Sequence, residues 1–194
     1  MVSLQRRAHK QAVFIGCFVM QEGKRKKGQF LTNVVVYLFT VLLVFIAVAT
    51  AAAGQHFEAT VTKIVDGDTI EVFHKGRSIR VRLWGIDTPE WRQPFSKVAK
   101  KYTAKLIENT EVELEEKDWD DYGRLVAIVT TKQKLCLNAE LLRAGLAWVH
   151  IYYCKEAICD TWYQIERDAR EKQSGLWRDK SPTPPWVWKR KKHS

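Results

Sequence analysis

The sequence predicts an α+β fold that is mainly β, a five-stranded barrel with about three helices packed on it. Three observations support this prediction. Segments with strand patterning come first, as a set of three and then a set of two, with one helical segment between the sets. Turn-forming Gly residues separate the strands, and helical periodicity follows them. This element order is that of the OB-fold, which frequently binds nucleic acids.

The strand patterning lies in five segments that alternate in polarity or are rich in β-branched and aromatic residues. Turns separate the first three segments, at Asp66-Gly67-Asp68 and at Lys75-Gly76, and a polar loop over 117–123 joins the last two. The expected strands are Phe57–Val65, Thr69–Phe73, Ile79–Ile86, Glu111–Glu116 and Arg124–Thr130.

Helical spacing predicts three helices. The first spans Ser96–Glu108, with Ser96 as N-cap and an apolar face at i, i+4 and i+8 formed by Val98, Tyr102 and Leu106. In the second, Asn138 caps a short helix that continues through Arg143 and stops at Gly145.

The third helix is expected to begin near Asp160, to carry Trp162, Ile165 and Ala169 on one face and to end at Gly175. The tail, 181–194, contains three prolines and a pair of tryptophans among basic residues. We expect this tail to be extended, without a helix, and docked by Trp186 and Trp188.

The positive charge of the chain lies at its ends. The chain of 194 residues has a formal net charge of +10, yet residues 54–188 carry 21 basic and 21 acidic side chains. Bulk charge is therefore no argument for a nucleic-acid partner, and such an argument must come from a site. We divide the chain into an N-terminal region (1–53), a barrel domain (55–180) and the tail (181–194).

An uncharged stretch, Val34 to Ala53, follows the basic run Lys24–Lys27 and ends in small residues. This pattern is typical of a secretory signal peptide. The alternative is an uncleaved membrane anchor, since about 20 apolar residues can span a bilayer. In both cases the barrel domain is exported: periplasmic or secreted, or anchored in the inner membrane by residues 34–53. Met20 as the true start would give the signal a more ordinary length.

Three cysteines remain after such a signal is removed: Cys136, Cys154 and Cys159. An oxidising compartment favours a short disulfide between Cys154 and Cys159. Cys136, in an apolar run, is expected to be a small buried side chain. The alternative is a zinc site formed by both of these cysteines with His150, although a fourth ligand is missing.

Carboxylates follow two different strands. Asp68 comes after the first turn, and Asp87 and Glu90 come at the end of the third strand. If the first three strands are antiparallel neighbours, these positions meet at one end of the sheet. Clustered carboxylates require a cation or raised pKa values. Oxygen ligands without His or Cys favour Ca²⁺ or Mg²⁺.

Two arginines belong to the same pattern. Arg82 lies in the strand that leads to Asp87, and Arg124 opens a later strand. Guanidinium groups beside a metal–carboxylate cluster suit a phosphodiester, whose transition state accumulates negative charge. Each residue alone has an ordinary explanation as a turn or surface residue, so the prediction depends on their combination.

The combination resembles the thermonuclease (staphylococcal nuclease-like) family. The resemblance runs from about Ala59 to Trp177. The motifs that carry it are Asp66-Gly67-Asp68-Thr69, Arg82-Leu83, Asp87-Thr88-Pro89-Glu90, Asp121-Tyr122-Gly123-Arg124 and the segment 138–147. It implies an OB-fold enzyme that uses Ca²⁺ to hydrolyse DNA and RNA and leaves 3′-phosphates. The implied substrates are single-stranded or locally unpaired, and a monomer is expected.

The resemblance also implies a role for each matching residue. Asp68 and Asp87 would bind Ca²⁺ through carboxylates and Thr88 through its carbonyl oxygen. Glu90 would act as general base on the attacking water. The remaining roles are phosphate binding by Arg82 and Arg124 and nucleotide contacts by Tyr122 and Tyr153.

The chain departs from the staphylococcal pattern at Ile151, in the loop after Glu90 and in the segment of Cys154 and Cys159. Nucleotide preference and the balance of endo- and exonuclease action are therefore open. The competing function is a non-catalytic OB-fold module that binds nucleic acid or protein. Inactive domains of this kind typically lose the acidic or arginine positions, whereas this chain has them all.

Overall fold

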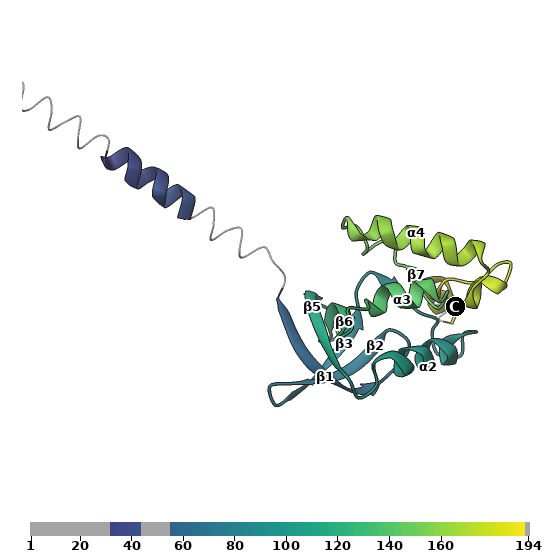
Figure 1. Ribbon diagram of the computed structural model, residues 1–194. Helices are drawn as coiled ribbons and strands as arrows, with labels where there is room; N and C mark the ends of the chain where they lie inside the picture. Colours follow the sequence, from purple (N-terminus) through teal and green to yellow (C-terminus); the bar gives the residue numbers. More distant parts are fainter. Residues whose placement is uncertain (1–31, 44–54, 193–194) are drawn as a thin grey trace, which may run out of the picture. The chain divides into compact units, whose positions relative to one another are not determined.

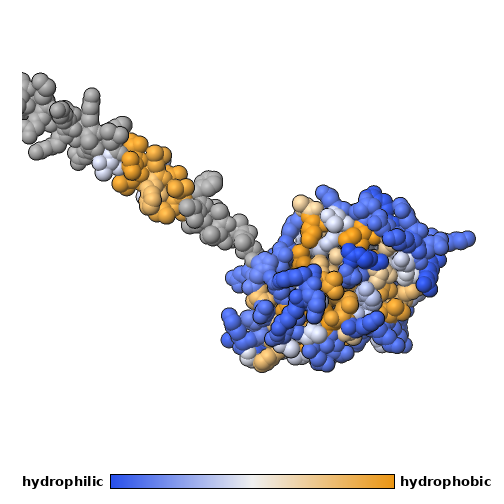
Figure 2. Space-filling model, viewed as in Figure 1, coloured by the Kyte–Doolittle hydropathy of each residue, from blue (hydrophilic) through white to orange (hydrophobic). Residues whose placement is uncertain are grey.

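The computed structural model describes residues 32–43 and 55–192. The chain consists of two compact units, Met1–Ala53 and Gly54–Ser194, which are described separately. In the first, residues 32–43 are helical, exposed and mostly apolar (Figure 2). Among the described residues, no helix combines the length and apolar character that a bilayer crossing requires. Part of the expected signal or anchor, 44–53, lies outside the described residues, as does Met20.

A closed five-stranded barrel forms the second unit (Figure 1). Its strand order is β1-β2-β3-β6-β5, with β3 and β6 parallel and the other pairs antiparallel. The bounds are β1 His56–Ile64, β2 Thr69–His74, β3 Arg77–Leu83, β5 Glu111–Trp119 and β6 Leu125–Thr131. Inward residues alternate with outward ones, as the sequence pattern requires. The mainly β barrel with packed helices is confirmed.

The third predicted strand is interrupted. β3 ends at Leu83, and a separate two-residue strand, β4 (Ile86–Asp87), pairs with β7 (Trp148–Val149) outside the barrel. Gly85 makes the break, because its φ of +70° suits glycine and a Cβ there would lie 2.9 Å from Trp162. The break turns Asp87 out of the barrel register and sets its position.

Helix α2 (Ser96–Ile107) matches the expected span, but two details were wrong. The N-cap is Phe95, in the left-handed region, and not Ser96. The buried face is Ala99, Thr103 and Ile107, one position beyond the predicted face, and Val98 is exposed. The reason is tertiary: the Thr103 hydroxyl donates to the Gly67 carbonyl oxygen at 2.6 Å, which turns this face toward the β1–β2 turn.

Helix α3 (Leu137–Arg143) is not capped by Asn138, contrary to the sequence prediction; Cys136 is its N-cap. Asn138 is fully buried instead. Its amide donates to the Trp84 carbonyl oxygen at 2.8 Å and its side-chain oxygen accepts from the Val129 N–H at 3.1 Å. These two hydrogen bonds join the end of β3 to β6. They outweigh the benefit of capping the helix, because the Trp84 carbonyl and the Val129 N–H would otherwise be buried without a partner.

Helix α4 (Ile158–Glu171) begins close to the expected start, and the 3₁₀ helix η1 (Gly175–Arg178) follows it. Trp162 and Ala169 are buried as predicted. The tail prediction was wrong in one respect, because Pro185–Lys192 forms the helix α5. Pro at its first position is favourable, since the missing N–H would have no helical acceptor there.

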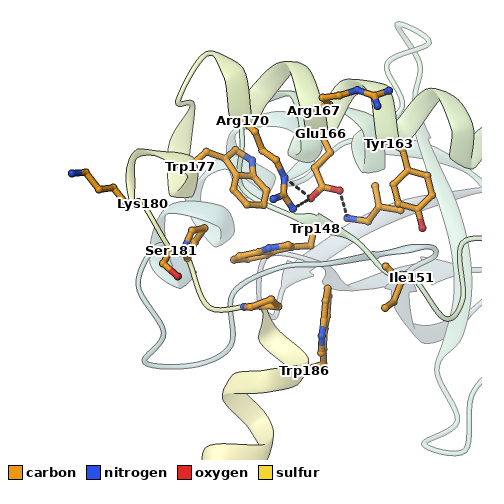
Figure 3. A pocket seen from close by; sticks show the side chains of 13 residues that line it. Trp148, Ile151, Tyr163, Glu166, Arg167, Arg170, Trp177, Lys180, Ser181 and Trp186 are labelled. Carbon is orange, nitrogen blue, oxygen red and sulfur yellow. Dashed lines mark hydrogen bonds and ion pairs between the residues drawn. The ribbon is translucent and has the colours of Figure 1, made fainter.

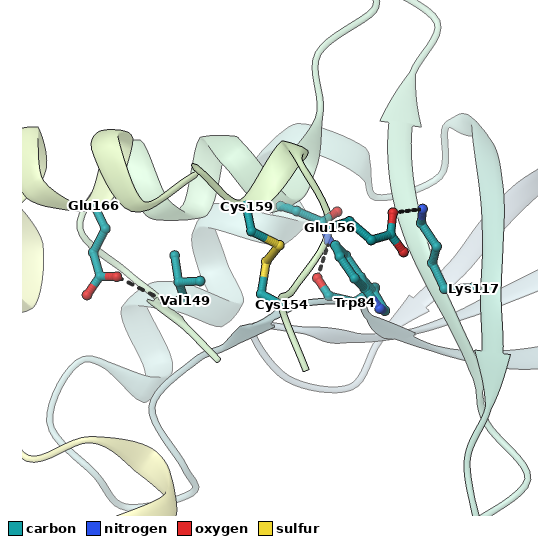
Figure 4. Close-up of a disulfide and its surroundings, with 8 residues drawn as sticks. Trp84, Lys117, Val149, Cys154, Glu156, Cys159 and Glu166 are labelled. Atoms are coloured by element: carbon teal, nitrogen blue, oxygen red, sulfur yellow. Dashed lines mark hydrogen bonds and ion pairs between the residues drawn. A yellow bond between two sulfur atoms is a disulfide. The ribbon is translucent and has the colours of Figure 1, made fainter. Parts of the chain in front are cut away.

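A disulfide joins Cys154 and Cys159, with the two Cα atoms 5.6 Å apart (Figure 4). It ties the loop after β7 to the start of α4. Both sulfurs are used, so the zinc alternative has lost two of its three ligands. The same loop is tied to β5 by an ion pair of Lys117 with Glu156 at 2.6 Å. Cys136 is a free thiol and is half-buried rather than fully buried.

Candidate active site

The antiparallel arrangement of β1, β2 and β3 brings the turn after β1 beside the end of β3. The Leu83 N–H donates to the Asp68 carbonyl oxygen at 2.8 Å. The buried Asp68 carboxylate accepts from the backbone N–H of Thr88 at 2.5 Å and from its hydroxyl at 2.7 Å. Residues 20 positions apart are thus joined at one end of the barrel, where the sequence predicted that they would meet.

Arg82 lies between the two predicted metal-binding carboxylates. Its guanidinium forms ion pairs with Asp68 and, at 2.5 Å, with Asp87. Side-chain exposure is 15% for Arg82, 7% for Asp68 and 3% for Asp87. Arg82 faces outward on β3, where Asp68 and Asp87 flank its guanidinium. One guanidinium fork therefore organises both carboxylates.

Burial dominates the pKa shifts of the two carboxylates whose pKa is raised here. Burial raises the pKa of Asp87 to about 6, against the lowering effect of Arg82. Burial and the neighbouring Asp68 raise the pKa of Asp66 to about 6. For Asp68, burial acts upward but Arg82 and the Thr88 hydrogen bonds outweigh it, so its pKa is lowered. Asp66, adjacent to the predicted ligand, belongs to the cluster although the sequence analysis gave it no role.

A cleft of about 230 Å³ opens beside this cluster. Asp68, Thr88 and Glu90 line it, together with Lys97 and Lys100 from α2. The Gln93 side chain fixes the backbone at Glu90, since its oxygen accepts from the Glu90 N–H at 2.9 Å. The Glu90 side chain is 31% exposed, so water can reach it.

Lys189 is the residue that the sequence analysis missed. Its ammonium lies 2.8 Å from the Glu90 carboxylate, and Asp87 also raises its pKa. The same tail is held against the site by a 2.6 Å hydrogen bond from the Gln93 amide to the Thr183 carbonyl oxygen. The only signal in the sequence was a basic tail with two tryptophans, which predicts docking but no target.

Arg124 lies directly before the strand β6, which pairs with β3. In β6, Val126 pairs with Arg82 of β3. Arg124 comes two residues before Val126, so its side chain is expected on the same outward face of the barrel as that of Arg82. Its guanidinium is held by Asp120 at 2.7 Å and lies 5.4 Å from the ring of Tyr122. Among the described residues, neither Arg124 nor Tyr122 contacts the carboxylate cluster through a hydrogen bond or an ion pair.

Tyr153 lies in the loop between β7 and α4, which the disulfide restrains. It is 69% exposed, and its ring centroid lies 4.5 Å from that of His150. Burial and the charge of Arg82 lower the pKa of His150, which favours the neutral imidazole. Tyr153 thus packs beside His150 and exposes most of its side chain to solvent.

The donor set fits a hard divalent cation. Asp66, Asp68, Asp87 and Glu90 supply four carboxylates, of which Arg82 pairs with Asp68 and Asp87 and Lys189 with Glu90. In the part of the chain that the structure describes, no three His, Cys, Asp or Glu side chains form a ready-made metal cage. A cation bound here would be held, as the family resemblance implies, by Asp68 and Asp87, with the Thr88 carbonyl oxygen, water and substrate as further oxygen ligands.

Comparison with known proteins supports the assignment that the fold and site suggest. The profile of the family described as "Staphylococcal nuclease homologue" matches residues 80–179. The chain is 35% identical over 153 residues to a "Micrococcal nuclease" of Shigella flexneri, covering 75% of this chain and 87% of the relative. An "Uncharacterized endonuclease" of Haemophilus influenzae is 37% identical over 154 residues, or 79% and 84% of the two chains.

The family match and the nuclease-named relatives place the chain in the class of hydrolases that act on phosphodiester bonds. The chain belongs to the staphylococcal nuclease family.

Proposed function

We propose that this nuclease is exported, depends on Ca²⁺, and cleaves single-stranded or locally unpaired DNA and RNA to leave 3′-phosphates. The observation that carries the proposal is the buried Arg82 fork on Asp68 and Asp87 beside a cleft that contains Glu90. The Ca²⁺ preference rests on the all-oxygen donor set and on the family resemblance, and the product end rests on the resemblance alone.

Each residue has a task that follows from its environment. Glu90, partly exposed in the cleft, takes a proton from the attacking water. Arg82, and Arg124 once it leaves Asp120, bind the phosphate oxygens and stabilise the charge that grows on them. The bound cation would polarise the phosphate and lower the pKa of a coordinated water.

Export is supported by two independent features. The uncharged stretch that follows a basic run is typical of an export signal or anchor. A disulfide in the folded unit is expected to persist only in an oxidising compartment. Mapping the N-terminus of the mature protein would separate cleavage of the signal from retention as an anchor.

The test is cleavage of single-stranded DNA by the full-length chain, with Ca²⁺ or with a chelator. We expect activity only with Ca²⁺ and a loss of at least about 100-fold in Glu90→Gln, as for removal of a group that acts in the transition state. Glu108→Gln, an exposed carboxylate at the end of α2, is the control. Absence of cleavage by the wild type, with DNA binding retained, would show the non-catalytic module instead.

The product end needs its own measurement. A 3′-phosphate blocks extension by a polymerase until a phosphatase removes it. Products that are extended without phosphatase treatment would contradict this part of the proposal and leave the nuclease activity itself intact.

A further inference from the structure

A second and larger hollow, of about 730 Å³, lies between α4, β7 and the segment that leads into α5 (Figure 3). We call it the α4–α5 groove. Its size lies within the range of ligand-binding pockets. Aromatic side chains form much of its wall: Trp148, Trp177, Trp186 and Tyr163. Trp148 and Trp177 are buried, whereas Trp186 is half-buried and Tyr163 is 36% exposed. Trp186 and Tyr163 thus offer ring surface to a ligand.

The groove carries net positive charge. Arg170 packs on Trp177, with its guanidinium carbon 3.8 Å from the ring centroid, and its charge is matched by Glu166 at 2.5 Å. Glu166 is further satisfied by the Val149 N–H at 3.2 Å. Arg167 and Lys180 are both exposed, and within residues 55–192 neither forms an ion pair, so these two side chains give the groove its charge. Flat apolar surface beside cations suits a polyanion with planar bases.

A row of rings extends from this groove, and helix α5 links the groove to the candidate active site. The His150 ring centroid lies 4.5 Å from that of Tyr153 and 5.3 Å from that of Trp186. On α5, Lys189 follows Trp186 by three residues, so both lie on one side of the helix with a rise of about 4.5 Å between them. Since Lys189 contacts Glu90, the same helix borders both the groove and the cleft.

We propose that the α4–α5 groove binds the single strand of the substrate on one side of the scissile phosphate. Bases would stack on Trp186 and Tyr163, and phosphates would contact Arg167 and Lys180. Paired bases in a duplex have no free faces for such stacking, so the groove selects unpaired strands. The identity of the ligand rests on the proposed function.

The test measures binding separately from cleavage. In the full-length Glu90→Gln background, we compare Arg167→Ala/Lys180→Ala with Lys172→Ala/Arg178→Ala. The second pair also removes two exposed charges, at the end of α4 and in η1, but neither residue lines the groove. The probes are fluorescent single-stranded DNAs of 3 and of about 12 nucleotides, the longer within the range of known single-strand sites.

For each variant we take the ratio of the Kd for the short DNA to the Kd for the long DNA. We expect this ratio to be about tenfold smaller in the groove variant than in its control. The slope of log K against log salt should also fall by about 1.4, because two phosphate contacts are lost on a single strand. Equal losses in both double variants would overturn the proposal, as would displacement of the DNA by polyglutamate of matched charge as effectively as by unlabelled DNA.

The two proposals fail separately. If the wild type cleaves DNA but the groove variant binds as its control does, the groove is wrong and the nuclease stands. If the wild type binds the longer DNA through the groove but never cleaves it, the groove stands and the nuclease proposal is wrong.

Discussion

Replacing Arg82 tests whether the carboxylate cluster is organised as the structure shows. Arg82→Met leaves Asp68 and Asp87 buried without their shared cation. Removing one partner of a buried ion pair typically costs about 3–5 kcal/mol. Asp87, whose pKa is already raised to about 6 by burial, can relieve part of this cost by binding a proton. We therefore expect a loss near the lower end, about 3 kcal/mol.

The assay is thermal or urea unfolding in chelator and in Ca²⁺. In chelator, a loss of about 3 kcal/mol corresponds to a fall in Tm of roughly 10 °C for a domain of this size. In Ca²⁺ at about 100 times its Kd, binding adds about 2.7 kcal/mol. Because the cation can replace the charge of Arg82, the gap between variant and wild type should shrink in Ca²⁺.

Arg80→Met is the matched control, two residues earlier on the same face of β3. Its pair with Glu71 is at 3.1 Å, but the arginine is 55% exposed and solvent screens the interaction. The control should lose less than about 1 kcal/mol. Equal losses in both variants, or a gap that Ca²⁺ leaves unchanged, would refute the reasoning.

Three further predictions concern the disulfide, one glycine and the tail. Replacing Cys154 and Cys159 by Ser opens a loop of sequence separation 5, so urea unfolding should show a loss of about 2 kcal/mol. Gly145→Ala should lose at least about 2 kcal/mol in the same assay, because Gly145 has a φ of +65° and a Cβ would lie 2.2 Å from a backbone oxygen. Lys189→Met should raise the KM for single-stranded DNA about fivefold, the equivalent of about 1 kcal/mol, since Glu90 would then repel the phosphates without a neighbouring cation.

Each of these has a control and a contrary outcome. Reductant should bring the wild type to the stability of the double Ser variant, and a difference between them would point to another cause. Gly76→Ala, with a φ of +79° and open space around it, should cost only about 1 kcal/mol, and an equal cost at both sites would argue against close packing at Gly145. Lys105→Met, an exposed charge on α2, should leave KM within about twofold; an unchanged KM in Lys189→Met as well would remove the tail from substrate binding.

Local patterns carried the fold prediction a long way. Alternation in 57–65 and 79–83 follows from the two-residue period of a strand with one buried face, so it is readable without any partner. The order of the strands then placed Asp68 beside the end of β3, and the hydrogen bonds to Thr88 show this contact. Helix α2 was located for the same local reason, although its buried face was not.

Errors arose where a distant part of the chain decides. Asn138 is a residue type that favours the N-cap position. Its side-chain amide instead forms hydrogen bonds with the backbone of Trp84, directly after β3, and of Val129, in β6. The tail has the composition of an extended segment, but docking against Gln93 and His150 stabilises a short helix that would be marginal alone. Such competition between a local and a non-local partner leaves no trace in residue spacing.

The sequence by itself determined the barrel and the family, because these depend on periodicity and on the order of motifs. Only the tertiary structure decided that Arg82 bridges Asp68 and Asp87 and that α5 delivers Lys189 to Glu90. Lys189 and Glu90 are 99 positions apart in the sequence. Bringing such distant charges together lowers the entropy of the chain, and this cost is offset only when the barrel closes and the tail docks.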